Sequence, residues 1–326
     1  VALAASRHDS FVVYQTIQKY TPKQPKKRIR LRMHDGTPAT PDQVLTMTKA
    51  YIQEVWQTAS QIVLPPMSPP GIPFTLDELI AEIARTPVTK SVAKTCLPGL
   101  CWRTNANMVG RFVFQKLQDW WNQSPPFVPS QWKAAHLTFI HKPAKTPDRL
   151  HHLRPLALLE PVGKCVLGLI TTKFAADVQP LICSWPQMAF MKMRSSYDAI
   201  RRVIGHCWRV RQLTQRRSVH QRANNLSSSA VQGGIQVLLD ANKAFDTVPR
   251  QELFSFLTEQ PIDARLISIL AQWHSHTSYE IMHGTEQHSV GTGRGVRQGC
   301  RAAPILWSTY TLARSEEHTS ELQSRF

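Results

Sequence analysis

The sequence predicts an α+β fold, because helical and strand periodicities are both clear in it. Apolar residues recur at helical spacing over residues 44–55 and 76–83, and each run follows a helix-start signal. Polar and apolar residues alternate over residues 132–140, and residues 278–290 read as a β-hairpin around a glycine. With 42% apolar residues in a chain of 326, the sequence is rich enough in hydrophobic side chains to build a core around these elements.

The helix-start signals are capping boxes at the N-termini of the first two predicted helices. Thr40 precedes Pro41 and is followed by Gln43, and Thr75 is followed by Glu78 in the same way. In each box a hydroxyl can accept a hydrogen bond from a backbone N–H that the first turn of a helix leaves unpaired. The two boxes therefore predict where both helices begin.

Apolar periodicity predicts four further helices. They cover residues 108–121, a segment capped by Ser195 with its apolar face at residues 200–207, residues 250–257 after Pro249, and residues 263–273. In the first of them, Phe112, Trp120 and Trp121 are interpreted as core residues rather than as a platform for stacking bases. Residues 214–234 are polar and rich in Ser and Asn, which predicts a loop.

The net charge of the chain indicates which class of binding partner to expect. A net charge of +17, from 39 Lys+Arg against 22 Asp+Glu, favours a polyanionic partner such as nucleic acid, although a basic protein without such a partner is the alternative. The six cysteines are scattered, as is typical of a reducing compartment, and Cys96 and Cys101 lack a second pair that would complete a zinc site. No signal peptide and no apolar run long enough to span a bilayer is evident, so we expect a nuclear or cytoplasmic location.

The strongest candidate for chemistry is Asp240, at the end of a predicted buried strand. The apolar run 235–239 follows a break at Gly233 and Gly234. A carboxylate at the end of a core strand can face a cleft, where Mg²⁺ is usually held by one or two carboxylates together with substrate phosphates. Taken alone, Asp240 could instead be a turn or capping residue, which is the commoner role for Asp at a strand end.

Residues 239–249, Leu-Asp-x-x-Lys-Ala-Phe-Asp-x-Val-Pro, resemble motif A of the palm in reverse transcriptases of LINE-type (non-LTR) retrotransposons; we name them the motif A segment. The resemblance implies that Asp240 is a catalytic ligand of Mg²⁺ or Mn²⁺. It also implies that Phe245, with Ala244 beside it, lies against the incoming nucleotide, where the aromatic ring excludes a 2′-hydroxyl. Asp246 is interpreted as structural, bonding local backbone at the strand-to-helix turn.

Residues 132–164 are similar to the fingers of the same enzymes, Trp-Lys…Lys-Pro-x-Lys…Arg-Pro-Ile-x-Leu…Gly-Lys. Lys142, Lys145 and Arg154 lie on the predicted strand-turn-strand hairpin, where cations can reach a triphosphate or a template backbone. The resemblance implies that Lys142 and Arg154 bind the nucleotide and that Lys145 binds nucleic acid. Lysines on a hairpin more often only protect an exposed edge, so spacing alone would not assign these roles.

Two further segments match the same family. Residues 186–200 are similar to the segment that precedes motif A, Gln-x-Gly/Ala-Phe-x-x-Gly-Arg-Ser-x-x-Asp-Ala-Ile, with Met193 in place of a Gly and with Arg194 as an expected nucleic-acid contact. Residues 293–307 resemble motif B, Arg-Gly-Val-x-Gln-Gly-x-x-x-Ser-Pro-x-Leu-Phe, and we name them the motif B segment.

In the motif B segment, the resemblance implies that Gln298 and Gly299 contact the nascent base pair and that Arg294 and Arg297 bind nucleic acid. A glycine lets the backbone approach a base pair closely, and a Gln amide can both donate and accept hydrogen bonds there. Ala303 replaces the Ser of the family pattern, which removes one hydroxyl contact.

The family supplies its remaining metal ligands from motif C, an aromatic-x-Asp-Asp hairpin downstream of motif B. No Asp follows Asp263 in this chain. Residues 313–326 read as the in-frame translation of a sequencing-library adapter, so we expect the natural coding sequence to continue into motif C.

Together, these matches predict a truncated α+β right-hand polymerase. Its expected parts are a basic linker with helices over residues 1–90, fingers over 91–205, a partial palm over 206–312 and an adapter-derived tail over 313–326. The expected activity is RNA-directed DNA synthesis from dNTPs, with an RNA template, a DNA primer and Mg²⁺, and without a membrane partner. This fragment alone is expected to be inactive. The alternative is a non-catalytic nucleic-acid-binding remnant of such an element.

Overall fold

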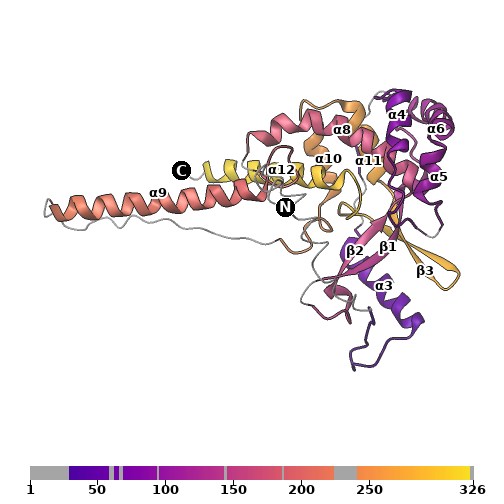
Figure 1. Cartoon of the computed structure of the whole chain (residues 1–326), viewed down its shortest axis with the longest axis horizontal. Helices are drawn as coiled ribbons and strands as arrows, with labels where there is room; N and C mark the ends of the chain where they lie inside the picture. The colour runs from indigo at the N-terminus through magenta and orange to yellow at the C-terminus, as the bar shows by residue number, and fades with distance from the viewer. Residues whose placement is uncertain are drawn as a thin grey trace, which may run out of the picture. The chain divides into compact units, whose positions relative to one another are not determined.

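The computed structural model describes residues 29–323 apart from 59–61, 66–68, 94, 143–144, 186 and 224–240, and for 213–222 and 315–323 it describes only the helical backbone. The chain divides into two compact units, Val1–Thr40 with Phe139–Arg154 and Pro41–Thr138 with Pro155–Phe326; we name them the small unit and the large unit. In chain order the elements are α3 (Pro41–Trp56), α4 (Leu76–Ala84), α5 (Gly99–Thr104), α6 (Ala106–Trp121), α7 (Ser130–Lys133), β1 (Ala134–His141), a 3₁₀ turn η1 (Leu150–His152), β2 (Leu153–Leu158), α8 (Pro161–Cys183), α9 (Ser196–Ala223), α10 (Arg250–Thr258), α11 (Ala264–His274), β3 (Thr277–His283), β4 (Glu286–Thr292) and α12 (Ala303–Gln323) (Figure 1). The predicted α+β class is confirmed.

The start of α4 has the capping box that the sequence predicts. The Thr75 hydroxyl accepts from the Glu78 N–H at 3.2 Å, and the Glu78 carboxylate accepts from the Thr75 N–H at 2.8 Å. α3 begins at Pro41, as expected, and buries Tyr51 and Val55. The starts of α6, α10 and α11 also lie within two residues of those predicted.

Four strands form one sheet in the order β2-β1-β3-β4. β1 pairs parallel with β3, in the register that places Ala134 opposite Ser278. β3 and β4 pair antiparallel over their full lengths, and Gly284 turns the chain between them at φ +59°. A positive φ at this position suits a residue without Cβ, so the predicted hairpin and its turn residue are both confirmed.

α8 is a long helix of the large unit with many buried side chains, and the patterns described above did not predict it. Glu160 caps this helix by accepting from the N–H groups of Val162 and Gly163. α8 packs against α4, α11 and α12. Its fully buried side chains are Val166, Leu167, Ile170, Phe174, Val178 and Ile182. The acidic cap and the apolar run behind it were the available signals for this helix.

α8 also corrects the expectation that no apolar run is long enough to span a bilayer. Of the helices in the described part of the chain, it is the one that is long and apolar enough to cross a membrane by length and composition. The same length and composition occur in helices at the centre of a protein core. Here the buried side chains of α8 contact protein.

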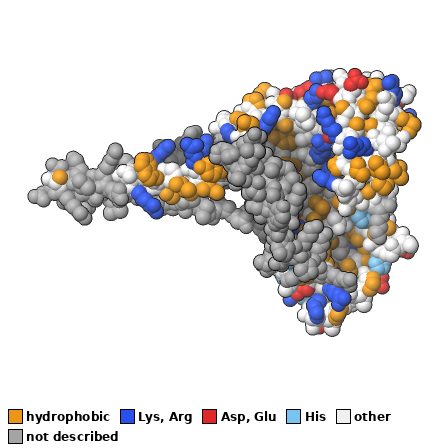
Figure 2. Space-filling model, viewed as in Figure 1, with side chains coloured by type: hydrophobic (Ala, Val, Ile, Leu, Met, Phe, Trp, Pro, Cys, Tyr) orange, Lys and Arg blue, Asp and Glu red, His pale blue; other side chains and the backbone are white. Residues whose placement is uncertain are grey.

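Two further interpretations are wrong. Residues 214–223 continue α9 instead of forming a loop, since Arg and Gln in this stretch favour helix; the rest of the expected loop lies outside the described residues. Phe112 is 62% exposed, although Trp121 of the same stripe is fully buried. The apolar face of α9 also lies at the surface, with Ile204 62% exposed, and Figure 2 shows hydrophobic and basic side chains side by side along this helix.

Candidate active site

The expected metal ligand Asp240 lies outside the described residues, so its role stays a prediction. Among the residues that the structure describes, no group of three or more His, Cys, Asp or Glu side chains could hold a metal ion. Asp246, the other acid of the motif A segment, is 4% exposed and accepts from Trp56 Nε1 at 3.2 Å and from Gln298 Nε2 at 3.2 Å. Asp246 therefore connects the motif A segment to α3 and to the motif B segment. The sequence indicated neither of these distant partners, Trp56 and Gln298.

The motif A and motif B segments are in direct backbone contact. The Val296 N–H donates to the Phe245 carbonyl at 2.7 Å, and the Gly295 N–H donates to the Val248 carbonyl at 2.8 Å. Gly295 has φ +82°, and a Cβ added to it would lie 2.4 Å from the carbonyl oxygen of Asp246. Only a residue without a side chain fits this approach, so the glycine of the motif B segment is required by the packing of the two segments.

Gln298 and Gly299 are held by the protein itself. The Gln298 amide nitrogen donates to Asp246, and its backbone carbonyl accepts from the Ala157 N–H at 2.7 Å. Gly299 has φ +108°, and a Cβ there would lie 2.4 Å from the Ala157 carbonyl oxygen. The close approach that the structure shows at Gly299 is to the main chain of β2, and its expected contact with the nascent base pair stays a prediction.

The ring of Phe245 is fixed between two other aromatic rings. Trp307 of α12 stacks on it at 5.5 Å between centroids and 25° between planes, and Phe190 meets it edge-on at 5.8 Å. Phe245 and Ala244 are both half-buried. A ring held from two sides cannot yield to a ligand without disturbing its neighbours, which is the property that size discrimination requires.

The three arginines expected to bind nucleic acid instead bond main-chain carbonyl groups. Arg194 donates to the carbonyls of Cys183, the last residue of α8, and of Trp185 and Gln187 beyond it, at 2.6–2.8 Å. Arg294 donates to those of Glu54 and Val55 in the last turn of α3.

Arg297 likewise bonds a main-chain carbonyl, and its contact with nucleic acid stays a prediction. It is 1% exposed and donates to the carbonyl of Lys133, so it offers no cation to a nucleic acid in this conformation. In the described part of the chain its Nε and Nη2 have no hydrogen-bond partner. Helix ends leave carbonyl groups unpaired, and guanidinium groups satisfy them well.

The remaining cations of the predicted site, Lys142, Lys145 and Arg154, belong to the small unit. The ammonium of Lys142 donates to the carbonyl of His151 at 3.0 Å, which ties the two sides of the hairpin turn. Lys145 and Arg154 are exposed. The residues of the motif A and motif B segments belong to the large unit.

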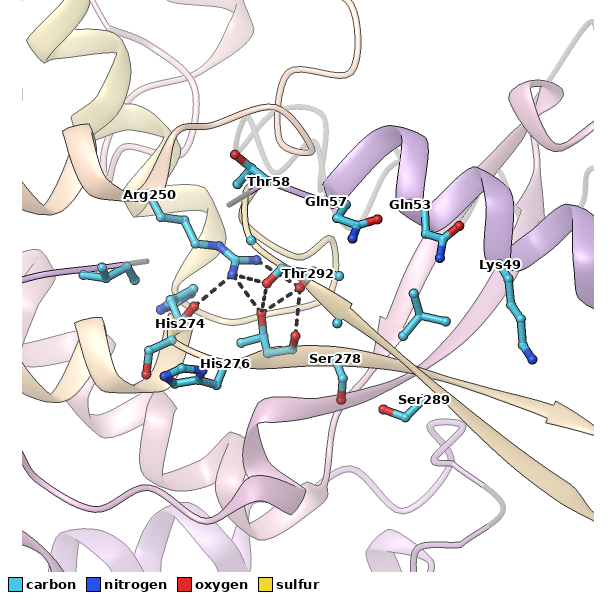
Figure 3. Close-up of a pocket in the computed structure, with 16 residues that line it drawn as sticks. Lys49, Gln53, Gln57, Thr58, Arg250, His274, His276, Ser278, Ser289 and Thr292 are labelled. Atoms are coloured by element: carbon cyan, nitrogen blue, oxygen red, sulfur yellow. Dashed lines mark hydrogen bonds between the residues drawn. The ribbon is translucent and has the colours of Figure 1, made fainter. Parts of the chain in front are cut away.

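Arg250 is the residue of this region that sequence reasoning missed. It is 3% exposed and makes six hydrogen bonds, all to neutral oxygens; Figure 3 shows those to His274, Thr277 and Thr292. The acceptors are the carbonyls of His274, Thr292, Arg294 and Gly295 and the hydroxyls of Thr277 and Thr292, at 2.8–3.3 Å. Burial, and after it the nearby cation of Arg297, lower the pKa of Arg250 to about 9. One side chain thus joins α10, the end of α11, both hairpin strands and the motif B segment.

Comparisons with known proteins agree with the motifs. A family model described as "Reverse transcriptase (RNA-dependent DNA polymerase)" matches residues 140–321, more than half of the chain. A relative from Drosophila melanogaster, "RNA-directed DNA polymerase from mobile element jockey", is 22% identical over 279 residues. The match covers 83% of this chain and 26% of that protein, so the chain spans about a quarter of the length of this relative. The resemblance inferred from the motif A and motif B segments is confirmed at the level of the family.

Proposed function

The chain belongs to the reverse transcriptase family, and from that premise we propose that it is part of the RNA-directed DNA polymerase of a non-LTR retrotransposon. In the proposed fold, a right hand, residues 91–205 belong to the fingers and residues 206–312 to the palm. The reaction transfers a nucleotide from a dNTP to the 3′-hydroxyl of a DNA primer on an RNA template. The observation that supports this most directly is the backbone docking of Phe245 on Val296, which brings motif A and motif B into one site.

The residues divide this work by their chemistry. Asp240 would bind a divalent cation, Mg²⁺ or Mn²⁺, which lowers the pKa of the primer hydroxyl and stabilises charge on the reacting phosphate. Phe245, braced by two rings, would exclude the 2′-hydroxyl of a ribonucleotide. Asp246 holds Nε2 of Gln298, which leaves the amide oxygen to accept a hydrogen bond from the nascent base pair. Lys142 and Arg154 would bind the triphosphate.

The test is primer extension on an RNA template with the full-length protein. Asp240→Asn removes the charge that a cation needs but keeps the shape of the side chain, so extension should be abolished while RNA binding is kept. Asp119→Asn, at an exposed position on α6, is the control for loss of one carboxylate and should extend normally. Extension by the Asp240→Asn protein would refute the assignment. RNA binding without extension by the unaltered protein would support the non-catalytic alternative.

A further inference from the structure

The large unit has a polar groove of about 770 Å³ between α3 and the β3–β4 hairpin, outside the residues assigned above to nucleotide binding. Lys49 and Gln53 of α3 line it together with Gln57, which follows the end of α3, and Ser278 and Ser289 face them from the strands (Figure 3). The three residues are spaced four apart, and the Gln57 N–H donates to the Gln53 carbonyl at 3.1 Å, so Gln57 extends the same face beyond the end of the helix. They span about 12 Å along its axis, from the rise of an α-helix.

The floor of the groove is cationic. Arg250 lines it, and all six of its hydrogen bonds go to neutral carbonyl or hydroxyl oxygens. Of the eight ion pairs in the described part of the chain, none involves Arg250 or the neighbouring Arg297, so both buried charges lack a carboxylate partner there. None of the 16 residues that line the groove is Asp or Glu. Buried cations without a counter-charge leave a positive potential that an anion can relieve.

The walls supply the kinds of group that contact a sugar-phosphate backbone. Gln and Ser side chains and Lys ammonium groups make such contacts without reading bases. Gly291 adds an open stretch of main chain, because nothing lies within 4 Å of where its Cβ would be. Among the described residues that line the groove there is no Phe, Tyr or Trp on which a base could stack. The groove therefore suits phosphates and sugars rather than a nucleobase.

We propose that this groove binds the phosphodiester backbone of a single-stranded polynucleotide. Its length along α3 exceeds one phosphate group, which favours a strand over a free nucleotide. The inference rests on the proposed function only in taking a polynucleotide as partner, and it assigns the contact to residues outside the motif A and motif B segments.

Glu280 of β3 is bonded to both serines of the strand wall. The hydroxyls of Ser278 and Ser289 both donate to its Oε1, at 3.0 and 2.9 Å. A carboxylate beside these serines repels phosphate. Replacing Glu280 with Gln should therefore strengthen binding, whereas an added acid on the opposite wall should weaken it.

The test measures fluorescence anisotropy of labelled single-stranded oligouridylate and oligothymidylate with the chain as it is. Gln53→Glu adds a charge at an exposed wall position with little change in shape, and we expect affinity to fall about fivefold, as one like charge at close range would cause. Gln118→Glu makes the same change at an exposed position on α6 and should alter affinity less than twofold. Lys49→Ala should lower the slope of log affinity against log salt by about one, and Lys116→Ala should leave that slope unchanged. Effects of equal size are expected for RNA and DNA, which share the phosphodiester.

Equal losses of oligonucleotide affinity in Gln53→Glu and Gln118→Glu would refute the groove as the binding site. The polymerase proposal would be unaffected, because it is tested separately by primer extension with Asp240→Asn. Absence of binding by the unaltered chain would also overturn it. If a dNTP displaced the oligonucleotide, and its own affinity fell equally in Gln53→Glu, the groove would bind a free nucleotide and the proposal of a polynucleotide strand would be refuted. Lower oligonucleotide affinity in Gln53→Glu together with higher affinity in Glu280→Gln would support the binding of a polynucleotide strand in the groove.

Discussion

Lowering the pH from 7 to 5 should destabilise this protein through one buried histidine, His274. Its side chain is 1% exposed, and Nδ1 lies 2.8 Å from the carbonyl of Leu270. A carbonyl only accepts, so Nδ1 carries the hydrogen and Nε2 is the nitrogen that must take a second proton. Nε2 has no hydrogen-bond partner in the described part of the chain. Burial, and after it the cations of Arg250 and Arg297, lower the pKa of His274 to about 3.

The size of the effect follows from proton linkage. Between the unfolded value of 6.5 and the folded value of about 3, the unfolded chain binds a proton that the folded chain does not. The free energy of unfolding therefore falls as the pH falls through this window, at about 1.4 kcal/mol per pH unit in its middle. From pH 7 to pH 5 the loss attributable to His274 is about 2 kcal/mol.

The assay is urea unfolding at both pH values, followed by the fluorescence of tryptophans such as Trp273, beside His274 in α11. His274→Leu removes the titrating group, so the variant should lose about 2 kcal/mol less than the unaltered chain between pH 7 and pH 5. His276→Leu, at an exposed histidine two residues along, controls for loss of an imidazole and should behave as the unaltered chain does. The same loss in the His274→Leu protein as in the unaltered chain would refute the role given to His274.

Four other substitutions test the packing and the site. Met193→Gly should raise the free energy of unfolding by about 1 kcal/mol, because Met193 has φ +63° and its side chain is 92% exposed; Met193→Ala should give no such gain. Gly295→Ala should lower it by about 2 kcal/mol or more, since the new Cβ meets the carbonyl of Asp246; a thermal melt that matches the unaltered chain would contradict this. Arg250→Met should lower the free energy of unfolding by about 3 kcal/mol, measured in urea, because the buried oxygens lose their donor. An unchanged urea midpoint would show that the six hydrogen bonds contribute little. Phe245→Ala in the full-length protein should raise ribonucleotide incorporation relative to deoxyribonucleotide in primer extension, and an unchanged ratio would exclude Phe245 from sugar discrimination.

Local features of the fold were predictable because they depend on neighbours in the chain. The capping box at Thr75 and Glu78 and the hairpin turn at Gly284 involve residues within three positions of one another. α8 was missed although its signals are local, an acidic cap at Glu160 followed by a long apolar helix. The error at Phe112 has another origin, since apolar residues on one helix are buried only where another element covers them.

The two segments of the candidate site were predictable from their motifs, but the partners of their side chains were not. The motif A and motif B segments indicated Phe245 and Gln298, and the structure brings both segments together. Arg194 and Arg294 were expected to bind nucleic acid because they lie in segments that resemble those of the reverse transcriptases. The structure bonds both guanidinium groups to carbonyls at helix ends, a pairing that no sequence spacing reveals.

By itself, the sequence determined the α+β class, the starts of several helices, the hairpin and the family, because periodicity, caps and ordered motifs are written in consecutive residues. Only the tertiary structure decided which cations are exposed, which are bonded to backbone, and that Arg250 joins five elements at a groove whose 16 lining residues include no Asp or Glu. Burial and hydrogen-bond partners arise from contacts between segments far apart in the chain, so the same arginine can be a surface ligand or a buried brace.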